Sequence, residues 1–336
     1  MFKRLLLLIA GCILTAGRIY AQDNHYQFSR LDIGDGLSNN AINCIYKDSK
    51  GFVWIGTGSG LNRYDGYTFK VFKHSEDTTA LTDDDVTGIF EGPSGKLWIA
   101  TMGGLNIYDP AEDRFEHDAD KQLKKLGIPE NYIWDIKKDH SGNFWFVHNN
   151  YGIYKYQPRE GKTLHLQHNA KENKSLYSND IAGIAESPDG SVWVVYRNGM
   201  LDKVDESTGL VTNRIDIVNK TARRSQANYH VFADRDGDLW VFEQGSPSGL
   251  FFYDVKKGTL KNINSKSGEG HLTSDIVTGV LQDNKNLIWV GTDHGGINVI
   301  NKKDFKVQSL LNRDGDSKSL SQNSITALYK GNDGIV

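Results

Sequence analysis

The chain has 336 residues and a formal net charge of −3, with 39 lysines and arginines against 42 aspartates and glutamates. A charge balance so close to neutral makes neither nucleic acid nor an anionic membrane surface an obvious partner. Hydrophobic residues make up 38% of the chain, enough for a globular core. The 35 glycines and only 6 prolines suit a fold with many tight turns.

Residues 1–21 predict an export signal. They begin with Lys3 and Arg4, continue in an apolar stretch too short to span a bilayer, and end in the small residue Ala21, after which we expect cleavage. A competing interpretation is lipoprotein acylation at Cys12, early in the same stretch. After cleavage at Ala21 only Cys44 remains, and we expect it to be a small buried residue rather than half of a disulfide.

Short apolar runs separated by turn residues follow the signal. In the first unit, residues 41–46, 52–57, 61–64 and 67–72 are rich in β-branched and aromatic residues and predict four strands. Helical periodicity is nearly absent. The exception is residues 120–127, which predict one or two helical turns ended by Gly127.

Six tryptophans recur along the chain at steps of 44 to 49 residues, each inside a similar phrase that reads GFVWIGT in the first copy. They are Trp54, Trp98, Trp145, Trp193, Trp240 and Trp289. Four strands repeated at this period are typical of the blades of a β-propeller. We expect each indole to be buried between blades, with its N–H on a backbone acceptor.

The two ends of the repeat region suggest how the ring closes. Residues 330–336 align with residues 47–53, so a seventh repeat begins and the chain stops one residue before an expected seventh tryptophan. Residues 25–31 resemble an outer strand without its own blade. We therefore predict an all-β fold: a seven-bladed propeller of four-stranded blades over residues 22–336, with the last blade incomplete, in a fragment of a longer protein.

Three segments of the first repeat carry a family resemblance: residues 35–40 (DGLSNN), 48–57 (DSKGFVWIGT) and 60–66 (GLNRYDG). Together they resemble the two-component regulator propeller repeat. The resemblance implies the periplasmic sensor region of a Bacteroidetes hybrid two-component system histidine kinase. It further implies later propeller and β-sandwich domains, attachment to the inner membrane through a segment absent from this chain, and sensing of glycan-derived oligosaccharides. We also expect the full-length sensor to be a homodimer.

Few motifs indicate chemistry within the chain itself. Residues 56–60 faintly resemble a phosphate loop but lead into a strand, so no helix N-terminus is available for an anion. Residues 234–238 and 314–316 resemble part of a calcium loop, which turn chemistry explains at least as well. We therefore predict no metal, no cofactor and no catalytic residue here, while the full-length protein is expected to be a histidine kinase.

The binding prediction rests on where the repeats depart from their own rule. The connection after the tryptophan strand is short and rich in glycine in the first two repeats, but carries larger polar and aromatic groups in the third to fifth. Departures confined to one face of a repeat protein suggest binding. The predicted ligand-binding residues are His148, Tyr151, Tyr196, Arg197 and Gln244, with Tyr132, Trp134 and Tyr229 near the mouth of the channel.

Three classes of function remain open from the sequence. The first is a sensor that binds an oligosaccharide or relays its binding to a downstream kinase. The second is a secreted propeller enzyme, a lyase or glycosidase. The third is a plain interaction scaffold. The unfinished seventh repeat favours the sensor, because an enzyme would more often be complete within one ring.

Overall fold

The computed structural model of the chain describes residues 26–129, 132–148, 150–217, 227–268 and 270–331. The predicted export signal lies outside these residues. Within the described part of the chain, no helix is long and apolar enough to cross a membrane.

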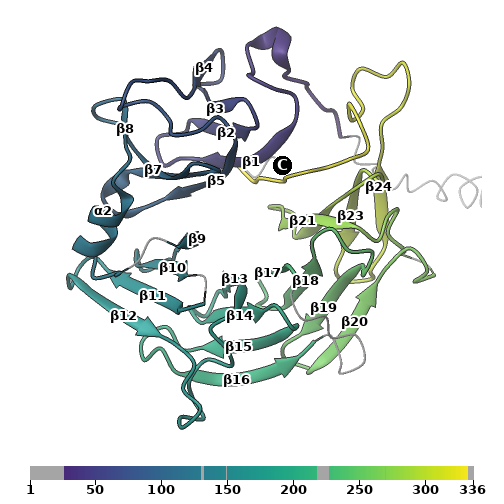
Figure 1. Ribbon diagram of the computed structural model, residues 1–336. Helices are drawn as coiled ribbons and strands as arrows, with labels where there is room; N and C mark the ends of the chain where they lie inside the picture. The colour runs from purple at the N-terminus through teal and green to yellow at the C-terminus, as the bar shows by residue number, and fades with distance from the viewer. Residues whose placement is uncertain (1–25, 130–131, 149, 218–226, 269, 332–336) are drawn as a thin grey trace, which may run out of the picture.

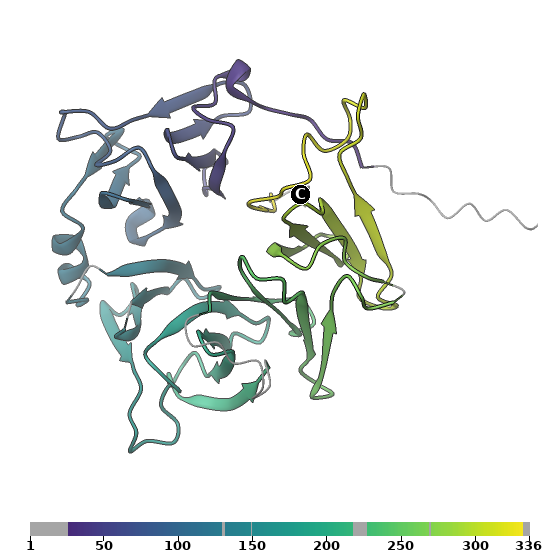
Figure 2. The same ribbon diagram turned by 45° about the vertical axis from the view of Figure 1, so that its right-hand side comes forward.

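The described residues form twenty-four strands in six antiparallel sheets, which we number as blades 1 to 6 (Figure 1). In each blade the four strands pair in chain order, with the first strand nearest the common centre and the fourth at the outside (Figures 1 and 2). The strands are β1 (Ile42–Lys47), β2 (Val53–Thr57), β3 (Gly60–Tyr64) and β4 (Phe69–Phe72) in blade 1; β5 (Val86–Glu91), β6 (Leu97–Thr101), β7 (Gly104–Asp109) and β8 (Arg114–Glu116) in blade 2; β9 (Ile133–Lys138), β10 (Phe144–His148), β11 (Gly152–Gln157) and β12 (Lys162–Leu166) in blade 3; β13 (Ile181–Glu186), β14 (Val192–Tyr196), β15 (Met200–Val204) and β16 (Val211–Asp216) in blade 4; β17 (Tyr229–Ala233), β18 (Leu239–Glu243), β19 (Leu250–Asp254) and β20 (Thr259–Ile263) in blade 5; and β21 (Val277–Gln282), β22 (Leu287–Thr292), β23 (Ile297–Asn301) and β24 (Val307–Leu310) in blade 6.

Helical structure is confined to short connections. One α-helix, α2 (Ala119–Lys125), lies in the link between blades 2 and 3, where the sequence predicts it. Its N-terminus is capped by the Asp118 side chain, which accepts from the backbone N–H of Lys121, and Gly127 follows it with a φ of +75°. Two 3₁₀ turns, η1 (Ile33–Asp35) and η2 (Pro93–Gly95), complete the helical elements of the described residues.

The prediction of seven blades is wrong: the propeller has six four-stranded blades. Residues 322–331 form no strand and run as one segment between blade 6 and blade 1 (Figure 1). Ile325 bonds to the carbonyl of Thr292 in blade 6, and the Tyr329 hydroxyl donates to the carbonyl of Lys47 in blade 1 at 3.2 Å. A blade needs four paired strands. The prediction counted the start of a seventh repeat in the sequence as a blade, although these residues form no strand.

The repeated tryptophans form the core, as predicted. All six are at most 3% exposed and pack between neighbouring sheets. The expected backbone acceptor for the indole is wrong in four blades, because the N–H donates to the carboxylate of an aspartate six residues earlier. The pairs are Trp54 and Asp48 at 2.8 Å, Trp145 and Asp139 at 2.8 Å, Trp240 and Asp234 at 2.9 Å, and Trp289 and Asp283 at 3.0 Å.

Antiparallel pairing gives the ring two distinct faces. The links between blades and the connections from second to third strands meet at one end of the strands, which we call the connection face. The turns from first to second and from third to fourth strands meet at the other end, the hairpin face. Cys44, on the inner strand β1, is half-buried, and burial raises the pKa of its thiol to about 12.

Candidate functional site

An aromatic group lies on the connection face of blade 3. His148 ends β10 and is 1% exposed, with the ring of Tyr151 at 4.8 Å and the ring of Tyr132 at 6.2 Å. Tyr132 and Tyr151 are 66% and 48% exposed. The chain turns here through Gly152, whose φ of +88° and close approach to the carbonyl of Leu166 exclude a side chain. A buried imidazole therefore supports two tyrosines that face solvent.

A cation follows on blade 4. Arg197 lies directly after β14, and its Nε is 3.0 Å from an Oδ1 of Asp180, a residue of the link between blades 3 and 4. The Arg197 side chain is 31% exposed, and its carbonyl accepts from the backbone N–H of Ala227 in the next link. The guanidinium is thus anchored at one nitrogen by a carboxylate and still reaches the surface.

Amide and imidazole groups lie on the connection face of blade 5. The exposed Gln244, directly after β18, accepts at its Oε1 from Asn228 Nδ2 at 3.0 Å and contacts His230 Nε2 at 3.1 Å. The His230 ring stacks on Phe242 at 5.1 Å. Burial lowers the pKa of His230 despite the bond to Gln244, so the imidazole is neutral at pH 7 and donates to the amide oxygen.

Of the other predicted site residues, Tyr196 and Tyr229 lie in the core and Trp134 is half-buried. Tyr196 is 1% exposed, and its hydroxyl donates to Asp202 Oδ2 at 2.6 Å. Burial and this carboxylate raise the pKa of the Tyr196 hydroxyl far above its usual range. Tyr229 is also 1% exposed, and Trp134 is half-buried against the core between blades 3 and 4. The rings of Tyr196 and Tyr229 therefore leave too little surface for a ligand to stack on.

The arrangement suits recognition better than catalysis. Flat aromatic surface, a guanidinium with free donors and a side-chain amide are the groups that fix an uncharged polyhydroxyl ligand by stacking and directed hydrogen bonds. Asp180 and Asn228 complete the set of surface groups, and the partly buried His230 contacts Gln244 from below. Asp180 and Asn228 belong to the residue pairs that end the links between blades, so the sequence could have indicated them. His230 lies inside a strand, and nothing in the sequence marks it as a site residue.

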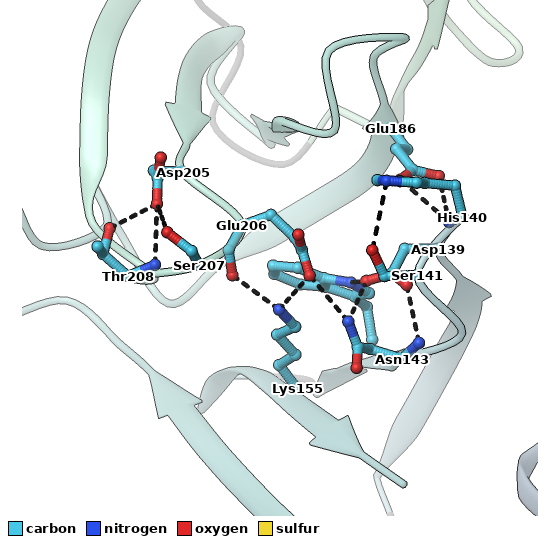
Figure 3. A network of polar contacts seen from close by, with 11 residues as sticks. Asp139, His140, Ser141, Asn143, Lys155, Glu186, Asp205, Glu206, Ser207 and Thr208 are labelled. Carbon is cyan, nitrogen blue, oxygen red and sulfur yellow. Dashed lines mark hydrogen bonds and ion pairs between the residues drawn. The ribbon is translucent and has the colours of Figure 1, made fainter. Parts of the chain in front are cut away.

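The hairpin face carries a network of polar contacts that ties blades 3 and 4 together (Figure 3). Lys155 of β11 is 1% exposed and donates to Glu206 of blade 4 at both its carbonyl, 2.7 Å away, and its Oε1, 2.6 Å away. Nearby, His140 contacts Glu186 through its ring Nδ1 and its backbone N–H, and this contact raises the pKa of His140. These contacts link one blade to the next.

The three aspartates of the calcium-like segment 234–238 bind a lysine side chain from another blade. Asp234, Asp236 and Asp238 offer three carboxylate oxygens within 4.8 Å of one another. Lys302 of blade 6 lies among them, with Nζ 2.7, 2.8 and 2.6 Å from the three carboxylates. Its ammonium occupies the place that a cation would take, so the cluster joins blades 5 and 6.

Comparisons with known proteins bear on the family. Residues 36–59 match the model of a family described as "Two component regulator propeller". A stretch of 63 residues is 38% identical to histidine kinase P4 of Formosa agariphila and covers 18% of this chain and 5% of the kinase. These matches confirm the resemblance to the two-component regulator propeller repeat.

Solved structures share the fold. The extracellular domain assigned to the hybrid two component system BT3049 of B. thetaiotaomicron superposes with a TM-score of 0.67 at 22% identity, over 92% of this chain and 40% of that chain. The corresponding domain of BT4673 from the same organism gives 0.66 at 22% identity, over 92% and 38%. The chain therefore spans less than half the length of these relatives.

Proposed function

We propose, from the two-component regulator propeller repeat at residues 36–59, that this propeller is a periplasmic sensor module of a hybrid two-component signalling protein. Its connection face binds a glycan-derived oligosaccharide, or a partner domain of the same protein that does so, and binding is relayed to a downstream histidine kinase. A secreted carbohydrate-active enzyme and a plain scaffold are the alternatives.

The observation that carries this proposal is the set of groups on the connection face of blades 3 to 5. Tyr132 and Tyr151 offer flat apolar surface, against which the C–H face of a sugar ring can lie. Arg197 and Gln244 offer donors and an acceptor for hydroxyl groups. Blades 1 and 2 have Ser59 and Met102 in the equivalent connections, which lack this combination.

The contacts between blades support a relay by movement of the ring as one body. Ion pairs connect neighbouring blades: an exposed one joins Lys138 to Glu91, and more buried ones join Lys155 to Glu206 and Lys302 to the aspartates of blade 5. Such a ring resists local deformation, so a ligand that prefers one arrangement of the sensor shifts the whole domain. Signalling then requires that the ligand bind two arrangements of the sensor with different affinities. It does not require a conformational change inside a blade.

The binding proposal predicts which variants lose affinity. In calorimetric titrations of purified protein with an activating oligosaccharide, Tyr151→Ala, Arg197→Ala and Gln244→Ala should each weaken binding, by about 2 kcal/mol or more for a central anchor. Ser59→Ala and Met102→Ala, on the same face of blades 1 and 2, serve as controls and should bind like the unaltered chain. Equal affinity in all five variants would place the site elsewhere.

The sensor proposal also predicts no catalytic turnover by this chain. Purified residues 22–336, incubated with a panel of polysaccharides and oligosaccharides, should release neither reducing sugar nor unsaturated product. Release of such a product, if a single carboxylate substitution abolished it without loss of folding, would establish the enzyme alternative instead.

A further inference from the structure

A pocket lies on the hairpin face, at the opposite end of the ring from the connection face. It has a volume of about 380 Å³ and lies where the inner strands of blades 4, 5 and 6 end. Phe232, Leu281 and Pro188 form an apolar part of its wall. Its volume is in the range of small-molecule sites, and such sites combine an apolar lining with a few polar groups.

The polar part of this wall holds basic and acidic side chains. Lys330, Arg235 and His140 all line the pocket. The two guanidinium bonds of Arg235 run to the neutral amide oxygens of Asn284 and Asn286, each at 2.9 Å, so they do not neutralise its charge. Arg235 and Lys330 line the same pocket, and burial together with the positive charge of Arg235 lowers the pKa of Lys330.

The carboxylates of the wall are already engaged. Glu186 contacts His140, and Asp234 accepts from Trp240 and pairs with Lys302. Asp283, outside the pocket wall, accepts from the Trp289 indole and from the backbone of its own turn, and its negative charge favours the charged form of Lys330. Among the described residues neither Arg235 nor Lys330 forms an ion pair, so both can still pair with an anionic ligand.

Blade 4 also departs from the aspartate rule on this wall. Ser187 stands where four other blades have the aspartate that accepts the indole N–H, and Ser187 lines the pocket. The Trp193 Nε1 atom behind it is buried and has no hydrogen-bond partner within the described protein. One anionic group that the repeat normally supplies is thus missing beside two cations.

We propose that this pocket binds a small organic carboxylate of about the size of a hexuronate, whose carboxylate pairs with Lys330 and Arg235 while its body lies against Phe232 and Leu281. The site is separate from the connection face, so the proposal stands whether or not that face binds an oligosaccharide. A carboxylate ligand fits because it supplies the negative charge that an aspartate provides at the equivalent position of four other blades and that Ser187 lacks.

Calorimetry on the purified chain tests this, with galacturonate as the ligand and galactose as the matched neutral probe. At about 0.15 M salt, where the Debye length is about 8 Å, surface attraction is largely screened. Galacturonate should give a saturable heat and galactose none. Lys330→Gln should weaken galacturonate binding by about tenfold or more, as expected for a hydrogen bond between charged groups.

Two further variants separate binding from folding. Ser187→Asp restores the aspartate of the other blades, so it should keep or raise the thermal unfolding midpoint while reducing galacturonate affinity by about tenfold or more through charge repulsion. Lys303→Gln, at an exposed lysine outside the pocket wall, should leave affinity unchanged. The proposal is overturned if galacturonate gives no saturable heat, if galactose binds equally well, or if Lys303→Gln weakens binding as much as Lys330→Gln.

Discussion

Replacing Lys302 with methionine should lower the free energy of unfolding by about 3–5 kcal/mol, the cost of removing one partner of a buried ion pair. Methionine keeps most of the length of the side chain but removes the ammonium that three aspartates share. Asp234 is 1% exposed and Asp238 is 7% exposed, so their charges cannot simply turn to water. Burial alone would lower the pKa of Lys302, but hydrogen bonds to the three carboxylates raise it above the usual lysine range.

Chemical denaturation with a matched control measures this effect. Lys303→Met alters the neighbouring exposed lysine and should change stability by less than about 0.5 kcal/mol. Adding Asp236→Asn to Lys302→Met should recover part of the loss, because it relieves repulsion between carboxylates that the lysine no longer separates. A Lys302→Met variant as stable as the Lys303→Met control would show that the cluster does not hold blades 5 and 6 together.

Replacing Asp48 with alanine should lower the free energy of unfolding by about 2–3 kcal/mol, since a buried donor left without a partner costs about 1–3 kcal/mol. Asp48 Oδ2 accepts from the Trp54 indole, and Oδ1 accepts from the backbone N–H groups of Lys50 and Phe52. The Trp54 side chain is 1% exposed, so water cannot replace the lost carboxylate there. Loss of the acceptor also removes the contacts that shape the hairpin turn.

The chain provides its own control for this substitution. Ser187→Ala changes the equivalent position of blade 4, where no aspartate is present, and should cost less than about 1 kcal/mol. Urea unfolding of both variants, followed by tryptophan fluorescence, gives the comparison. Similar losses in the two variants would mean that the aspartate–tryptophan bond adds nothing to the stability of a blade.

The repeat made most of the fold predictable. Each tryptophan strand is a short, mostly apolar run between turn residues and is buried on both faces, so its position and burial follow from local sequence, as does the short helix ended by Gly127. The number of blades did not follow, because sequence similarity registers where a repeat starts, whereas a blade exists only when four strands pair. Residues 322–331 begin a repeat but pack as a single segment on Gly291 and Lys47.

The sequence indicated which connections form the candidate site, but not which of their residues are exposed. Tyr196 and Arg197 are neighbours in the sequence, yet one is the last residue of β14 and points into the core, while the other reaches the surface. Successive strand residues face opposite sides, so a one-residue difference in where the strand ends reverses the assignment. The six-residue spacing from aspartate to tryptophan was visible in four repeats, but only the closed hairpin shows that it makes a hydrogen bond.

Hydrogen exchange on the purified chain, with and without a bound activating oligosaccharide, tests most directly whether the connection face of blades 3 to 5 is the sensing surface. The ligand should slow exchange in peptides that contain Tyr151, Arg197 and Gln244, and should leave the turns at Asp48 and Asp139 on the hairpin face unchanged. Slower exchange at those turns alone, or no change anywhere in the chain despite binding by the full-length protein, would contradict this prediction.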